Sequence, residues 1–157
     1  MKRTQKRMTL CICLLIVCLA FIWGNSLTNG EDSGNLSGGI MAWINAFLRL
    51  DAAGADKLHW LIRKGAHFTE FACLGLLLTW LFGMMGEKKG HLFCMPLLFG
   101  MMAACVDETI QVFVPDRGPN PVDIWIDTCG VTAGIVILLA GYLYACKKHT
   151  MNLEETI

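Results

Sequence analysis

The chain has 157 residues, of which 55% are hydrophobic and 17% are charged, a composition typical of membrane proteins rather than soluble single domains. Its formal net charge is zero, and no basic stripe is interleaved with aromatic residues, so a nucleic-acid partner is not expected. The placement of the charges along the chain is therefore more informative than their sum.

Four apolar stretches each approach the roughly 20 residues that a helix needs to cross a bilayer. With their flanks they predict membrane spans over residues 8–25, 64–85, 91–111 and 123–146. We therefore expect an all-α, integral membrane four-helix bundle, in which residues 64–150 form the core unit.

The first span follows a basic N-terminus, residues 1–7. Its basic residues are Lys2, Arg3, Lys6 and Arg7. A basic start before an apolar run also suits a secretory signal peptide. The run ends without a clean small-x-small cleavage site, although residues 24–26 offer a weak one, so an uncleaved anchor is the preferred interpretation.

The second segment, residues 26–63, is predicted to be an extracytoplasmic loop. Residues 31–39 are rich in Gly, Ser, Asn and acids, which is typical of a flexible connection. Apolar residues from Ile40 to Leu48 then recur at helical spacing, which predicts a short helix at the membrane interface or packed on the bundle. Residues 52–55 are interpreted as a break before the second span.

The charges favour one orientation in the cell membrane. A cytoplasmic N-terminus places eight basic and three acidic residues inside, and five basic and ten acidic residues outside. This distribution fits the positive-inside rule. Both termini are therefore predicted to be cytoplasmic, and residues 147–157 form a cytoplasmic tail.

All eight cysteines fall within or at the ends of the apolar stretches, and none belongs to a CxxC pair. The long polar connection, which a disulfide would stabilise most, contains no cysteine. The cysteines are therefore interpreted as small apolar packing residues.

Ionisable residues open the second span, where each charge near the bilayer centre costs about 2.5–3.5 kcal/mol on insertion scales. Lys64, His67 and Glu70 are spaced by three and share one helix face. Arg63 and Lys64 could instead extend to the surface as snorkelling side chains. His67 and Glu70, together with Asp107 and Asp127 farther along the chain, are the stronger candidates for a functional role, because ionisable residues within membrane spans are functional candidates by default.

A second polar group ends the third span and a third group opens the fourth. Asp107, Glu108 and Gln111 come before a proline-rich connection that contains Arg117. Asp123 and Asp127 follow at i,i+4. The predicted topology puts all of these residues at the outer side, so we expect one site there, although an ion-pair network that holds the helices together is the alternative.

Three ordered motifs cover the second to fourth spans. They are Lys64-x-x-His67-Phe68-x-Glu70-Phe71, Asp107-Glu108-x-x-Gln111-x-Phe113-x-Pro115-x-Arg117 and Asp123-x-x-x-Asp127-x-x-Gly130. Together they resemble the VanZ-like membrane protein family. Its name-giving member is associated with low-level resistance to the glycopeptide teicoplanin, so the resemblance implies a bacterial cell-envelope role. Phe71 stands where a tyrosine is common in the family, and Asp127 where an asparagine is common.

The leading functional hypothesis is an enzyme or modifying protein that handles a lipid-linked or wall-associated envelope precursor at the outer face. His67 would act as general acid or base, with Glu70 orienting it and Asp107 or Glu108 supplying the complementary group. Basic side chains would bind phosphate, and polar ones would complete the substrate site. These substrate-binding candidates are Arg63, Lys64, Gln111, Arg117, Asp123 and Asp127.

Three alternatives remain open at this stage. The acids could hold Mg²⁺ or a related cation, but their spacing matches no metal motif, so a metal-free site is preferred and no cofactor is assigned. A non-catalytic envelope scaffold, or a binder that shields precursors from a glycopeptide, would need the same residues without turnover. A proton-coupled carrier is disfavoured because the inner halves of the spans are almost wholly apolar.

Overall fold

The computed structural model describes residues 2–27, 44, 51–86, 90–115 and 120–154, and every regular element within those ranges is a helix. The helices are α1 (Lys2–Leu27), α3 (Ala52–Met84), α4 (His91–Val112) and α5 (Pro121–Glu154). All four are long and apolar enough to cross a membrane. The predicted all-α, multi-pass membrane fold is confirmed. The expected interfacial helix falls outside the described ranges, Ile44 excepted.

The start of α3 differs from the sequence prediction. Residues 52–55, interpreted as a break, form the first turn of a helix that continues without interruption through the predicted second span. Asp51 explains this start, because its backbone is extended and its carboxylate accepts a hydrogen bond of 2.9 Å from the Gly54 N–H. A good N-cap thus outweighs a glycine in the first turn.

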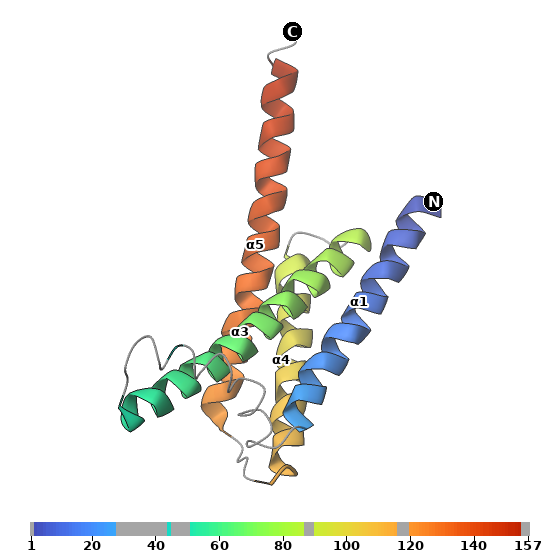
Figure 1. The fold of residues 1–157 in the computed structure, drawn as a ribbon. Coiled ribbons are helices and arrows are strands. Elements are labelled where there is room, and N and C mark those ends of the chain that lie inside the picture. Colours follow the sequence, from blue (N-terminus) through green and yellow to red (C-terminus); the bar gives the residue numbers. More distant parts are fainter. Residues whose placement is uncertain (1, 28–43, 45–50, 87–89, 116–119, 155–157) are drawn as a thin grey trace.

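The four helices pack around α3, which contacts α1, α4 and α5 (Figure 1). The most extensive of these contacts is with α5. In Figure 1 both termini lie toward the same end of the bundle, as four spans require, and α5 continues well beyond the other helices. This arrangement places the end of α1, the end of α4 and the beginning of α5 together at the opposite end.

Small residues let α5 approach α3 at backbone distance. A Cβ atom added at Gly134 would overlap the Ala72 carbonyl oxygen and lie 2.8 Å from the Leu76 nitrogen. A Cβ atom at Gly130 would overlap the Phe68 carbonyl oxygen in the same way. The small-xxx-small spacing of these two glycines therefore sets the separation and register of the two helices, as it does in many membrane helix pairs.

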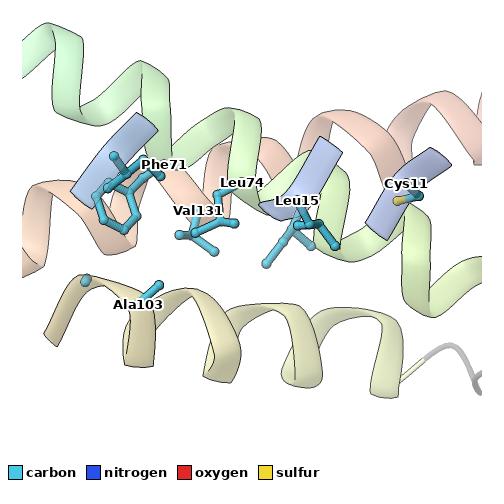
Figure 2. Close-up of a cluster of buried hydrophobic side chains, with 9 residues drawn as sticks. Cys11, Leu15, Phe71, Leu74, Ala103 and Val131 are labelled. Atoms are coloured by element: carbon cyan, nitrogen blue, oxygen red, sulfur yellow. The ribbon is translucent and has the colours of Figure 1, made fainter. Parts of the chain in front are cut away.

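Val131 of α5 packs closely against both α3 and α4. Val131 is fully buried. A Cβ atom added at Gly75 of α3 would overlap its backbone carbonyl, and one added at Gly100 of α4 would overlap its side chain. Around it lies a compact apolar core that includes Leu15, Phe71 and other residues shown in Figure 2. Many large apolar side chains on the outer helix faces are exposed, for example Ile16 at 62% and Ile137 at 60%, which fits a surface in contact with lipid.

We expect Gly134→Ala to destabilise the bundle by about 1–3 kcal/mol, because the added methyl group would meet the α3 backbone rather than a movable side chain. Gly141→Ala is the matched control, since it lies on the same helix with no atom within 4 Å of its Cβ position and shares the gain in helix propensity. Thermal unfolding of the purified protein in detergent measures both. Equal midpoints for the two variants would contradict the close packing of α3 and α5.

Candidate functional site

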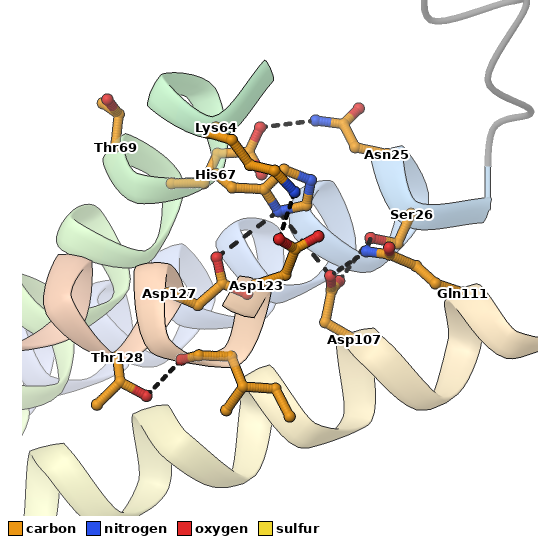
Figure 3. A network of polar contacts seen from close by, with 12 residues as sticks. Asn25, Ser26, Lys64, His67, Thr69, Asp107, Gln111, Asp123, Asp127 and Thr128 are labelled. Atoms are coloured by element: carbon orange, nitrogen blue, oxygen red, sulfur yellow. Dashed lines mark hydrogen bonds and ion pairs between the residues drawn. The ribbon is translucent and has the colours of Figure 1, made fainter. Parts of the chain in front are cut away.

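Polar side chains from all four helices meet at the end of the bundle opposite the termini. We call this group the polar cluster, and most of its members are less than 10% exposed. Its residues are Asn25 and Ser26 of α1, Lys64, His67 and Glu70 of α3, Asp107, Glu108 and Gln111 of α4, and Asp123 and Asp127 of α5. Figure 3 shows most of these side chains pointing toward one another.

The inner face of α3 explains why a lysine and a histidine are buried there. Lys64, His67, Phe71 and Leu74 follow one another at helical spacing, and all four are buried. The same stripe therefore carries polar residues at the end of the bundle and apolar residues in the core. Glu70 turns toward α1, where its carboxylate accepts a hydrogen bond of 3.0 Å from the Asn25 amide.

Asp107 is fully buried and joins α1 to α4. One carboxylate oxygen accepts a hydrogen bond of 2.7 Å from the Ser26 hydroxyl, and the other accepts one of 2.8 Å from the Gln111 amide. Gln111 also donates to the Ser26 hydroxyl at 3.2 Å. These donors fix the orientation of the carboxylate.

His67 faces two carboxylates from two other helices. Its Nδ1 atom lies 4.0 Å from the nearer Asp107 oxygen and 3.8 Å from the nearer Asp127 oxygen (Figure 3). Asp127 is fully buried, and neither of its oxygens accepts a hydrogen bond from any residue in the described ranges. An imidazole and two carboxylates are thus held together in a region from which most solvent is excluded.

Lys64 forms an ion pair with Asp123 across the α3–α5 interface. Its side chain is only about 10% exposed, and the ammonium also lies 5.9 Å from the centre of the Trp60 ring. The expectation that Lys64 merely extends to the surface is wrong, because burial and a close carboxylate hold it inside the bundle. Its assignment as a phosphate ligand stays a prediction.

The beginning of α5 is capped by Asn120. The Asn120 side chain accepts a hydrogen bond of 3.1 Å from the Val122 N–H, whereas Asp123 lies within the first turn. The Asn120 backbone N–H also donates to Glu108 at 3.0 Å. Asn120 therefore caps α5 and connects it to α4.

Most of the residues predicted from the sequence lie in the polar cluster, with two exceptions. Arg63 is half-buried and forms no ion pair with the described residues, and Arg117 lies outside the described ranges. The sequence interpretation missed Asn25, Ser26 and Asn120. Asn25 and Ser26 could have been predicted, because they directly follow the first apolar run and must therefore lie at the same membrane side as the other polar groups.

The polar cluster contains more acidic than basic residues. It has five carboxyl groups, those of Glu70, Asp107, Glu108, Asp123 and Asp127, but one lysine and one histidine. Burial makes each unpaired carboxylate costly, so the excess must be balanced by protons or by a bound cation. Such an arrangement can transfer protons or hold a positively charged group.

The family model of VanZ/LLP1 matches residues 11–143, which is most of the chain. The protein belongs to the VanZ/LLP1 family. No curated protein and no solved structure matches the chain. The matched range contains every residue of the polar cluster, so this cluster lies within the part of the chain that is characteristic of VanZ/LLP1 proteins.

Breaking the Lys64–Asp123 ion pair from one side should destabilise this VanZ/LLP1 protein. We expect Lys64→Met to cost roughly 3–5 kcal/mol, because it leaves the Asp123 carboxylate buried without its cation. Lys57→Met, at an exposed position of the same helix, is the matched control.

The double variant Lys64→Met/Asp123→Asn removes both charges and should recover much of the lost stability. Unfolding midpoints in detergent measure all three variants. A midpoint for Lys64→Met equal to that of Lys57→Met would show that the pair is not buried as described.

Proposed function

We propose that this VanZ/LLP1-family protein acts at the outer face of the bacterial cell membrane, where its polar cluster binds or modifies a lipid-linked or wall-associated envelope precursor. Through this action it would contribute to resistance against a glycopeptide such as teicoplanin. The observation that carries the proposal is the buried convergence of His67 with Asp107 and Asp127 from three helices.

The geometry supports acid–base chemistry at His67. Imidazole changes its protonation near neutral pH, and a neighbouring carboxylate can stabilise its charged form and fix its ring. Asp107 is itself held by Ser26 and Gln111, so it is pre-oriented for this task. Glu70 accepts from Asn25 and lies on the α1 side, which makes its predicted role of orienting His67 less direct than that of Asp107.

The position of the polar cluster suits a substrate that remains in the membrane. The positive-inside distribution of charges supports an outer location, because the polar cluster lies at the bundle end opposite the termini. A lipid-linked molecule could place its apolar chain along the exposed helix faces and its headgroup at this end. Arg63, half-buried beside the polar cluster on α3, is the described residue best suited to contact a headgroup phosphate.

A structural role for the polar cluster is the second candidate, and a specific observation favours it. The hydrogen bonds of Ser26 with Asp107 and of Asn25 with Glu70, like the Lys64 ion pair, each join two helices. A network of this kind would stabilise a non-catalytic envelope scaffold. The two functions can be distinguished by substitutions. A catalytic or binding residue can be changed with loss of activity but not of the folded protein, whereas a change to a structural residue reduces the amount of folded protein.

We expect His67→Gln to abolish protection against an envelope-directed glycopeptide while the protein remains at normal abundance in the membrane. Glutamine keeps polarity and much of the volume of histidine but cannot exchange protons near neutral pH. The measurement is the minimal inhibitory concentration for deletion cells complemented with each variant, with membrane abundance determined by immunoblot.

His59→Gln is the matched control, because this histidine lies on the same helix outside the polar cluster. It should protect as well as the wild type. Full protection by His67→Gln would contradict the proposed function, whereas loss of abundance for His67→Gln alone would favour the structural role.

A further inference from the structure

We propose that His67, Asp107 and Asp127 together bind one divalent metal ion of the Zn²⁺ class. Each residue offers one ligand atom, and these atoms all lie within 4.8 Å of one another. The three side chains come from α3, α4 and α5, so no spacing along the chain could have revealed them as a set. This inference rests on the proposed function for the role of the ion, but the binding itself is a separate physical claim.

The distances fit an ion between the three ligands. Metal–nitrogen and metal–oxygen bonds of about 2.0–2.2 Å place two ligands of one ion roughly 3–4 Å apart. The His67 Nδ1 atom lies 3.8 Å from Asp127 and 4.0 Å from Asp107, within that range. Small side-chain rotations would therefore bring all three atoms to bonding distance.

Asp127 is the observation that points to a ligand rather than to a closed internal network. Its carboxylate is fully buried, it is directed at His67 in Figure 3, and no described residue donates a hydrogen bond to it. The nearby ammonium of Lys64 is already paired with Asp123. A buried carboxylate in this position is stabilised by a cation that coordinates it.

Two other members of the polar cluster hold one of the proposed ligands in place. Ser26 and Gln111 each donate a hydrogen bond to Asp107, and such donors hold a metal-binding carboxylate in its coordinating orientation. Three protein ligands leave at least one position open for a further ligand, as in catalytic zinc sites. That open position could take a phosphate oxygen of the substrate, which explains how a site rich in acids can accept an anionic headgroup.

The donor set selects the class of ion. One imidazole and two carboxylates suit Zn²⁺ or a neighbouring transition metal better than Mg²⁺, which prefers oxygen ligands and retains its waters. We therefore expect Zn²⁺ to bind at least 100-fold more tightly than Mg²⁺.

The test is isothermal titration calorimetry of ZnCl₂ into the purified full-length protein, stripped with a chelator and held in lipid nanodiscs. We expect about one Zn²⁺ per chain for the wild type and at least tenfold weaker binding for Asp127→Asn. Glu108→Gln is the matched control, because Glu108 is also a buried acid of the polar cluster but lies outside the three ligands. It should bind Zn²⁺ within threefold of the wild type.

Two results would overturn the inference: no stoichiometric Zn²⁺ binding by the wild type, or equal weakening by Glu108→Gln and Asp127→Asn. The first result would overturn the metal site even if a variant fails to fold, because it is measured on the wild-type protein. Absence of Zn²⁺ binding together with loss of protection by His67→Gln would overturn the metal site and leave the proposed function standing. Zn²⁺ binding by the wild type together with full protection by His67→Gln would support the metal site and overturn the proposed function.

Discussion

The burial of carboxylates inside an apolar bundle is the constraint on which the rest of this structure depends. A carboxylate removed from water needs a hydrogen-bond donor, a cation or a proton, and each solution requires a partner at a defined position. Asp107 obtains its donors from α1 and from its own helix, and Asp123 obtains its cation from α3. The interactions of a few buried or half-buried acids therefore join all four helices at the polar cluster.

The glycine packing between α3 and α5 also determines where the buried acids of α5 lie. Gly130 and Gly134 bring the two backbones into contact, and Asp127 lies on the same side of α5 as Gly130, one turn earlier. His67 precedes Phe71 by one turn on the facing side of α3. Apolar packing in the core thus sets the distance between His67 and Asp127 at the end of the bundle. A bulkier residue at either glycine would move α5 away from α3, both in the core and at the polar cluster.

Much of this arrangement could be predicted from the sequence, because a membrane restricts the choices. Apolar length identified four helices, and helical spacing placed Lys64 and His67 on one face. Polar groups at alternate ends of successive spans must meet at one membrane side. The position of the polar cluster followed from these rules without any knowledge of side-chain contacts.

Other features could not be predicted because they depend on contacts between distant residues. Nothing local distinguishes Ser26, yet it donates to an acid far along the chain. Lys64 has the sequence context of a snorkelling lysine, and only the approach of α5 reveals that Asp123 holds it inside. The helix start at Asp51 was missed for a different reason, since one capping side chain overcame the weak helix preference of a glycine.

The contacts of His67 with the acids of α4 and α5 can be measured by ¹⁵N NMR of histidine-labelled protein in nanodiscs. The chain has four histidines, so the spectrum is simple to assign with His67→Gln. We expect Asp127→Asn to shift the ring-nitrogen signals of His67 and to leave those of His59 and His91 unchanged, because the His67 Nδ1 atom lies 3.8 Å from that carboxylate. An unchanged His67 signal would show that His67 and Asp127 are not in contact.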